Sequence, residues 1–579
     1  MNLLGINAYH GDAAACVVVD GKLVAAVEEE RFRRVKHWSG FPSESIRWCL
    51  EAAGVRPGDL DHVAVGRNPS AHLLRKAAYA ILRRPNASFV NDRRTNRARV
   101  LGVGADLCEA LGVDRATLRA RIHFVEHHCS HLASSFFVSP FDEAVCVSID
   151  GFGDFISTMV AQGRGGRIRV KRSVGFPHSL GAFYTAGTQY LGFAAYGDEY
   201  KVMGLAALGE PAYLQTLRDV VRDESRGMFS LDTRWFRHPR EIVDVKWEGG
   251  SPELGRYYSD RWIQELGPPR EPGAPIEARH RDLARSLQAR LEEVYGNLIR
   301  EALKEPGPAA LCLSGGCAFN SVANGRVLEE RPDLRLYVPP AAGDAGTAIG
   351  AAFWVWNQVL GNPRVFHLEQ AALGPDYAPE RIRRAVEGAG LAYRWIGDEE
   401  ERVARTATLL EAGAVVGWFQ GREEWGPRAL GHRSILADPR RKEMKEVLNE
   451  RIKRREPFRP FAPSILAERA SEYFETSHPS PFMTQTYRVK PAMQGAISAA
   501  THVDGSARPQ TVTREANPLF ERLLRVFGER TGVPVLLNTS FNENEPIVHT
   551  PEQAIACFRR TRIDALVLGG ALLERSGAA

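Results

Sequence analysis

The stretch LLGINAYHGD, residues 3–12, is an apolar strand that runs into a polar loop containing glycine and aspartate. Apolar segments at 14–20 and 22–29 follow it, and the dipeptide Asp20-Gly21 between them is typical of a two-residue hairpin turn. The start of the chain is therefore predicted to form a strand, a loop and a β-meander.

A second copy of this plan begins at EAVCVSID, residues 143–150, and continues through Gly151 to strands at 155–162 and 167–172. Two such copies, each followed later by helical segments, predict a duplicated α/β domain of the actin-like, sugar-kinase (ASKHA) type. In that type two related halves close around a nucleotide. Two unrelated β-rich stretches would give a similar pattern, and the pattern alone favours neither interpretation.

The length of 579 residues is enough for two or three domains, and 44% hydrophobic with 25% charged residues is typical of a folded globular protein. Glycine and proline residues between 360 and 378 indicate a linker. We expect an actin-like domain over 1–360, a linker over 361–378 and a second α/β domain over 379–579.

Composition also bears on location and partners. Eight cysteines without a CxxC pair favour reduced thiols in the cytoplasm. The start of the chain lacks a basic flank and cleavage site, and no run approaches 18 apolar residues, so neither secretion nor a membrane span is expected. A net charge of only +5 argues against a dedicated nucleic-acid scaffold.

The sharpest cluster of chemistry-bearing residues is EHHCSH, residues 126–131. On a helix, His127 and His131 project from one face at a spacing that a divalent metal can bridge. Asp150 ends a predicted strand and Asp344 lies in a glycine-rich loop, so both could complete the site. Two imidazoles and two carboxylates suit Fe²⁺, Mn²⁺, Co²⁺ or Zn²⁺. A histidine pair four apart also arises by chance on a helix surface.

Two loops of the first domain carry further candidates. His10 could act as a general base toward an alcohol, and Asp12 could hold its tautomer or bind a nucleotide's metal. A turn with a polar cap also explains His10 and Asp12, and without more context it is the better interpretation. The turn SGGCAFN (314–320) would let phosphate or ribose approach the backbone, while Lys201 marks a loop-to-helix junction.

In the second domain, the window 428–459 holds eleven basic and five acidic residues, an excess larger than that of the whole chain. It could be a solvated helix, a nucleic-acid patch or a pocket for a small polyanion. The flanks GPRALGHRS (426–434) and FRPFAPS (458–464) are rich in Pro, Gly and apolar residues, which favours the pocket. LNTSFN (537–542) ends a buried strand with short polar side chains, and Arg508 adds a further cation.

These blocks together identify a family: the chain resembles the NodU/CmcH O-carbamoyltransferases essentially from end to end. The resemblance rests on ordered motifs that include EEERF (28–32), EHHCSH, KVMGLA (201–206), SGGCAFN, GPRALGHRS, FRPFAP and LNTSFN. With it, the metal interpretation of the histidine pair becomes the favoured one.

The resemblance implies two catalytic domains. The C-terminal one looks like the YrdC-type α/β synthases and would join carbamoyl phosphate and ATP, with Mg²⁺, into carbamoyl-adenylate. The N-terminal one is similar to the actin-like partner of threonylcarbamoyl-tRNA synthesis and would transfer the carbamoyl group to a hydroxyl of an antibiotic or other natural product. Homodimers also fit the family, whereas nucleic acid and membrane are not expected partners.

The resemblance also implies roles for individual residues. The metal, typically Fe²⁺, would be held by His127, His131, Asp150 and Asp344. In the first domain, adenosine would contact the turn with Gly315, Gly316 and Asn320, with Lys201 nearby. In the second domain, carbamoyl phosphate and ATP would be bound by Arg428, Arg433, Lys453, Arg459, Arg508, Asn538 and Ser540, of which Lys453 and Arg428 are the expected catalytic residues.

One departure from the family concerns the first loop. Many members read His-Asp directly, and here Gly11 separates His10 from Asp12. We assign His10 and Asp12 as catalytic, with His10 as the base toward the acceptor alcohol. Two alternatives remain: a tRNA-modifying threonylcarbamoyl transferase, disfavoured by a basic excess confined to one apparent cleft, and a noncatalytic nucleotide-binding module of the actin-like class.

Overall fold

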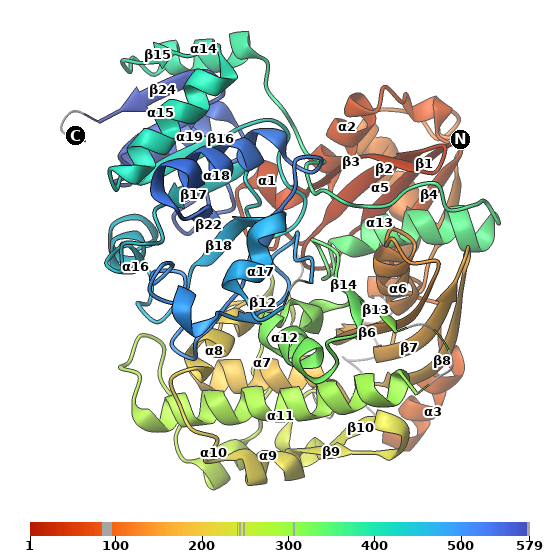
Figure 1. Ribbon diagram of the computed structural model, residues 1–579. Coiled ribbons are helices and arrows are strands. Elements are labelled where there is room, and N and C mark those ends of the chain that lie inside the picture. Colours follow the sequence, from red (N-terminus) through yellow and green to blue (C-terminus); the bar gives the residue numbers. More distant parts are fainter. Residues whose placement is uncertain are drawn as a thin grey trace. The chain divides into compact units, whose positions relative to one another are not determined.

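The computed structural model describes residues 1–83, 95–239, 241, 245–246, 249–304, 307, 309–476 and 478–575 (Figure 1). Contacts within the chain divide it into two units, Met1–Leu368 and Glu369–Ala579. That the segments 1–360 and 379–579 carry separate catalytic tasks stays a prediction.

The first sheet of unit 1 is built around the opening strand. Its strand order is β3-β2-β1-β4-β5. The three strands β1 to β3 form the antiparallel meander, whereas β4 and β5 run parallel to β1. The strands are β1 (Asn2–Asn7), β2 (Ala14–Val19), β3 (Lys22–Glu28), β4 (His62–Val65) and β5 (Arg121–Phe124).

The second sheet repeats this plan with the order β8-β7-β6-β13-β14. Again a three-stranded antiparallel meander is continued, beyond its first strand, by two parallel strands. The strands are β6 (Glu143–Gly153), β7 (Ile156–Arg164), β8 (Arg167–Gly175), β13 (Ala310–Ser314) and β14 (Arg335–Tyr337). Two sheets with the same order and directions confirm the predicted duplicated α/β domain and exclude two unrelated β-rich stretches.

The two helices α6 (His127–Phe136) and α13 (Gly346–Phe353) pack against each other, and each also packs on a sheet. Helix α13 lies against β1 and α6 against β6 and β13 (Figure 1). Glycines make this approach possible. A Cβ on Gly350 would lie 1.8 Å from the carbonyl oxygen of Ser130, and one on Gly5 would lie 2.2 Å from that of Ala348.

The remaining helices and short strands of unit 1 complete its layers around these sheets. The helices are α1 (Glu29–Arg33), α2 (Ser43–Ala52), α3 (Leu73–Arg83), α5 (Val103–Leu111), α7 (Leu180–Tyr190), α8 (Glu199–Ala206), α9 (Leu214–Val220), α10 (Asp260–Leu266), α11 (Ala278–Ala302) and α12 (Ser321–Glu330). The short antiparallel pairs are β9 (Val221–Asp223) with β10 (Phe229–Leu231), and β11 (Val245–Lys246) with β12 (Glu253–Leu254).

Unit 2 is built on one mixed sheet of order β15-β24-β23-β16-β17-β22-β18-β21. Its strands are β15 (Arg394–Trp395), β16 (Val416–Phe419), β17 (Arg433–Ala437), β18 (Ala462–Leu466), β21 (Gln510–Val512), β22 (Val535–Ser540), β23 (Ala565–Leu568) and β24 (Ala571–Glu574). A separate pair joins β19 (Tyr487–Arg488) to β20 (Ser506–Ala507). The predicted second α/β domain is thus confirmed as α/β, and its YrdC-like character stays a prediction.

Helices of unit 2 cover this sheet. They are α14 (Pro379–Gly388), α15 (Glu399–Glu411), α16 (Met444–Val447), α17 (Ala470–Tyr473), α18 (Pro518–Thr531) and α19 (Pro551–Arg560). Helices α15 and α18 pack together over a core that contains the fully buried Trp418, Phe520 and Phe527. Among the described helices of both units, none combines the length and hydropathy that crossing a membrane requires.

Gly350 allows a direct test of the helix contact. We expect Gly350→Ala to lower the stability of unit 1 by about 3 kcal/mol or more, because the added methyl group meets the backbone of Ser130, which cannot rotate away. Gly388→Ala is the control: no atom of the described residues lies within 4 Å of its Cβ position at the end of α14, so stability should be unchanged or slightly higher. Scanning calorimetry measures both, and equal melting temperatures would contradict the inferred contact.

Candidate functional site

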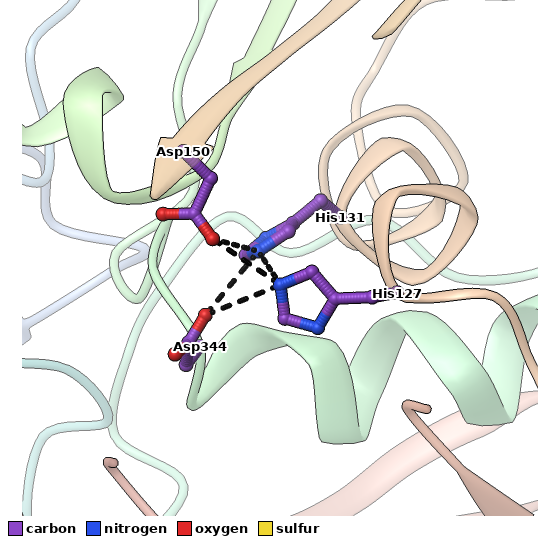
Figure 2. A group of neighbouring side chains, drawn as sticks. All are labelled: His127, His131, Asp150 and Asp344. Atoms are coloured by element: carbon purple, nitrogen blue, oxygen red, sulfur yellow. Dashed lines mark hydrogen bonds and ion pairs between the residues drawn. The ribbon is translucent and has the colours of Figure 1, made fainter. Parts of the chain in front are cut away.

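Four buried side chains converge in unit 1: His127, His131, Asp150 and Asp344 (Figure 2). The Nε2 atoms of the two histidines are 3.0 Å apart. Asp150 Oδ2 lies 3.2 and 3.3 Å from them, and Asp344 Oδ1 lies 3.4 Å from each. One atom from each of the four predicted metal ligands therefore faces a common centre.

The local backbone explains this convergence. The side chain of Glu126 accepts the N–H of Cys129 and caps the start of α6. Because His127 and His131 are four residues apart on this helix, they lie on the same face in successive turns. Asp150 lies on β6, where the backbone N–H of Gly316 donates to its Oδ1 at 2.8 Å and turns Oδ2 toward the histidines. Gly153 leaves room for the ring of His127, because a Cβ there would lie 1.9 Å from Cδ2.

The distances fit a divalent metal. Bonds of about 2.0–2.2 Å from the centre of a tetrahedron place the ligand atoms roughly 3.3–3.6 Å apart, close to the 3.0–3.4 Å found here. Asp344 Oδ1 is buried and has no hydrogen-bond partner among the described residues, as expected of an atom whose lone pair is reserved for a metal. The group can therefore hold a metal ion, and its geometry does not select one element.

The buried charges of this group also favour a bound metal ion. Two buried carboxylates require about two compensating positive charges. Burial alone would lower the pKa of His127, but the attraction of Asp150 and Asp344 outweighs burial and raises that pKa well above its ordinary value. Burial raises the pKa of Asp344, but the attraction of His10, His127 and His131 outweighs burial and lowers that pKa well below its usual range. A divalent cation would supply the charge that protons otherwise provide.

The predicted base His10 lies directly beside this group. Its Nδ1 forms an ion pair with Asp344 Oδ2, the oxygen that faces away from the histidines. His10 therefore orients a carboxylate of the cluster, as residues behind metal ligands commonly do. Asp12, two residues on, contacts a different partner: its Oδ1 lies 2.7 Å from Nδ1 of His37.

His37 was missed by the sequence reasoning, although it follows the EEERF motif closely. Its backbone N–H donates to Glu30 Oε2 at 2.9 Å, so the motif's last glutamate and Asp12 both hold it. Burial lowers the pKa of His37, but Asp12 and Glu30 outweigh burial and raise it to about 9. The glutamates of EEERF could have pointed to His37, because a run of acidic residues close to a histidine in the sequence indicates that one of them interacts with its imidazole.

The residues predicted to hold adenosine play mixed roles. The Gly315-Gly316 turn supports Asp150, and Gly315 adopts a φ of +86° that favours glycine. Asn320 caps α12 and exchanges two side-chain hydrogen bonds with Gln288, at 2.9 and 3.0 Å. Lys201 pairs with Asp198 at 2.9 Å. The side-chain amide of Asn320 is thus engaged in packing, and its predicted contact with adenosine gains no support from these bonds.

In unit 2, the predicted anion residues Arg428, Arg459 and Arg508 lie within electrostatic reach of one another, together with Arg455, which sequence reasoning had not singled out. Burial lowers the pKa of Arg508 well below its ordinary value, and repulsion from the other three arginines lowers it further. Arg508 makes no ion pair or hydrogen bond with any described residue. Such concentrated positive charge calls for an anion.

Lys453 contacts the loop that follows β22. Its ammonium is buried and contacts Ser540 O at 2.5 Å, Asn542 Oδ1 at 2.6 Å and Asn542 O at 2.9 Å. Ser540 Oγ donates to Asn542 Oδ1 at 2.8 Å. Lys453 and Ser540 are thus brought together as predicted, and Lys453 holds the turn after β22 in place.

Asn538 and Arg433 have contrasting surroundings. Asn538 donates to Ser464 and Gln510, while its own Oδ1 is buried without a partner among the described residues. Arg433 is fully buried, lies 3.6 Å over the ring of Phe419 and donates to the backbone carbonyls of Gln420, His432 and Pro375. Its guanidinium is committed to the interior, so the prediction that it binds phosphate gains no support from its position.

Comparisons with known proteins follow the same division of the chain. A family model described as "Carbamoyltransferase N-terminus" matches residues 2–353, and one described as "Carbamoyltransferase C-terminus" matches residues 407–575. The uncharacterised protein sll1178 of Synechocystis sp. is 40% identical over 99% of this chain and 97% of its own length. The nodulation protein NolNO of Sinorhizobium fredii is 38% identical over 99% of this chain and 80% of its own.

Among solved structures, the (R)-2-hydroxyglutaryl-CoA dehydratase component A of Acidaminococcus fermentans is 14% identical and covers 61% of this chain and 97% of its own. Its TM-score is 0.32. The two family models, by contrast, together span most of the sequence and match both units. The chain belongs to the carbamoyltransferase family and is a transferase enzyme.

Proposed function

We propose that this carbamoyltransferase makes carbamoyl-adenylate from carbamoyl phosphate and ATP in unit 2. We further propose that unit 1 transfers the carbamoyl group to a hydroxyl of a natural product. The observation that carries the proposal is the proximity of Arg508 to three other arginines, Arg428, Arg455 and Arg459. A phosphate-rich ligand would relieve the repulsion between Arg508 and these three. Carbamoyl phosphate and ATP with Mg²⁺ are both such ligands.

In unit 2 the arginines would bind the phosphates, because planar guanidinium groups pair with phosphate oxygens through two hydrogen bonds each. The unpartnered Oδ1 of Asn538 would accept a hydrogen bond from the carbamoyl NH₂ group. Lys453 would keep Ser540 and Asn542 in place at the end of β22. Arg433 we now propose as a residue that holds the segments at Gln420 and Pro375 in place by donating to their backbone carbonyls.

In unit 1, His127, His131, Asp150 and Asp344 would hold a divalent metal, with Fe²⁺ as the proposed ion. Bound there, the metal would act as a Lewis acid toward the carbamoyl or phosphate oxygen. The chain's own contribution is to fix the donors: Gly316 orients Asp150, and His10 orients Asp344. A cytoplasmic location and a homodimeric state remain predictions.

The overall reaction can be tested with purified protein, ATP, Mg²⁺, carbamoyl phosphate and a panel of alcohols. The panel holds kanamycin A, erythromycin A, a hydroxymethyl β-lactam and maltotriose, one compound for each acceptor class. We expect one panel compound to gain the mass of a single carbamoyl group, only when ATP and carbamoyl phosphate are both present. Transfer to unmodified tRNA instead, with threonine, would favour the alternative of a threonylcarbamoyl transferase.

Arg508→Met tests the anion site in unit 2. The substitution removes a charge-assisted hydrogen bond worth about 1.5–3 kcal/mol, so carbamoyl-phosphate-dependent pyrophosphate release should fall roughly 10- to 150-fold. Stability of unligated unit 2 should rise, because the repulsion of Arg508 from Arg428, Arg455 and Arg459 disappears. The control Arg514→Met changes an exposed arginine six residues later. Pyrophosphate release at the wild-type rate in Arg508→Met would refute the assignment.

Asp344→Asn tests the proposed metal group, which consists of His127, His131, Asp150 and Asp344. Asparagine has nearly the same shape as aspartate. The variant loses an anionic ligand, so we expect metal affinity to fall about tenfold or more. The metal-to-protein ratio after dialysis against a weak chelator, read by mass spectrometry, provides the measurement. Asp142→Asn, at an exposed aspartate of the same unit, is the control and should retain the metal. Equal metal content in both variants would show that Asp344 is not a ligand.

A further inference from the structure

The loop His10–Asp12 joins the metal group to a second set of titratable side chains, Asp12, Glu30 and His37, which offer ligand-type atoms within 4.8 Å of one another. His10 faces Asp344 on one side, and Asp12 faces His37 on the other. The proposed function so far assigns no task to His37.

The geometry of His37 is that of an oriented imidazole. Nδ1 donates to Asp12 Oδ1 at 2.7 Å, and this bond leaves Nε2 as the acceptor nitrogen. Nε2 makes no hydrogen bond within the described part of the chain, and the side chain is 30% exposed. A carboxylate on one nitrogen with the other nitrogen open is the arrangement of a general base.

Gly197 keeps that second nitrogen open. Its φ is +84°, and a Cβ at this position would lie 2.4 Å from His37 Nε2. Any other residue would therefore cover the nitrogen. The space beside Nε2 depends on a glycine in a conformation that glycine favours.

Tyr196, the residue before this glycine, connects the pair to the metal group. Its ring lies 5.2 Å from that of His37, between centroids. Its hydroxyl oxygen lies 2.8 Å from where a Cβ of Gly11 would be, and Asp344, Asp12 and Asp150 all act on it electrostatically. The absence of a side chain at Gly11 thus lets the tyrosine hydroxyl lie between the two groups.

We infer that His37, oriented by Asp12, is the catalytic base that accepts the proton of the acceptor hydroxyl during carbamoyl transfer, and that His10 is a positioning residue for Asp344. This inference rests on the proposed function. As the alcohol O–H bond breaks, its proton passes to His37 Nε2 and the alcohol oxygen bonds to the carbamoyl carbon. The bond from that carbon to the adenylate oxygen breaks, and AMP leaves with the electron pair.

Electrostatics separate the two histidines. His10 contacts Asp344, a member of the four-residue group, and its side chain is therefore engaged in positioning that carboxylate. His37 faces Asp12 and Glu30, which lie outside the metal group and stabilise the imidazolium that forms. The charged or titratable groups that act on or contact His37 are Asp12, Glu30, Lys36, Tyr196 and Glu199.

The test compares His37→Gln with His62→Gln, a control histidine on β4 that pairs only with His123 among the described residues. Three quantities are measured: carbamoyl-phosphate-dependent pyrophosphate release, bound metal, and transfer to the panel alcohol that the wild type carbamoylates fastest. We expect His37→Gln to lower transfer by roughly 10²- to 10⁴-fold, with pyrophosphate release and metal content unchanged. The control should match the wild type in all three.

A pH profile adds a readout that a purely structural role would not move. Transfer by the wild type should rise with pH up to about 9, because His37 must lose its proton to act as a base. Asp12→Asn removes a negative charge from the imidazolium, so the rising limb should shift to lower pH while the plateau rate falls. This milder variant keeps the test available should His37→Gln fail to fold.

The outcomes are distinguishable. Transfer at the wild-type rate by His37→Gln, or a rising limb that Asp12→Asn leaves in place, overturns this inference alone. Loss of one metal equivalent in His37→Gln overturns it in favour of a second metal site at Asp12, Glu30 and His37. Absence of both pyrophosphate release and transfer in the wild type overturns the proposed function, and this inference with it.

Discussion

The close contact of two helices in unit 1 is the constraint on which its site depends. Helix α6 supplies His127 and His131, and α13 begins just after Asp344. The two helices can bring these residues together only because Gly350 has no side chain where it meets the backbone of Ser130. Helix α13 also packs on β1 and α6 on β6 and β13, so the geometry of the four-residue group is set by packing between both halves of the duplication.

The feature that distinguishes unit 2 is an unfavourable concentration of positive charge around Arg508. Arg508 is surrounded by like charges and has no counter-charge among the described residues, an arrangement that destabilises the unligated protein. Two other buried cations of unit 2 do have hydrogen-bond partners: Lys453 donates to Ser540 O and Arg433 to Gln420 O. Binding energy from an anion would offset the repulsion.

The sequence predicted those parts of this architecture that leave a local signature. The duplicated sheet followed from two similar strand-and-meander patterns. The four-residue group was suggested by the spacing of His127 and His131, with Asp150 at the end of a strand and Asp344 in a loop, and the family resemblance made it the favoured interpretation. His37 was missed because its partner Asp12 lies 25 positions away, with no periodic pattern between them. Arg433 was predicted to bind phosphate because it lies in a charged window, but its side chain is buried in the interior. Composition does not tell which way a side chain points.

The repeated sheet has a consequence for how the first site is organised. The turn from β1 into β2 and the turn from β6 into β7 are the same corner of the same topology, used once in each half. One corner presents His10 and Asp12, and the other lies beside Asp150. A scaffold that is symmetric in its strands therefore carries an asymmetric arrangement: one copy of the corner contributes Asp150 to the four-residue group, and the other contributes His10, which contacts Asp344, and Asp12, which contacts His37.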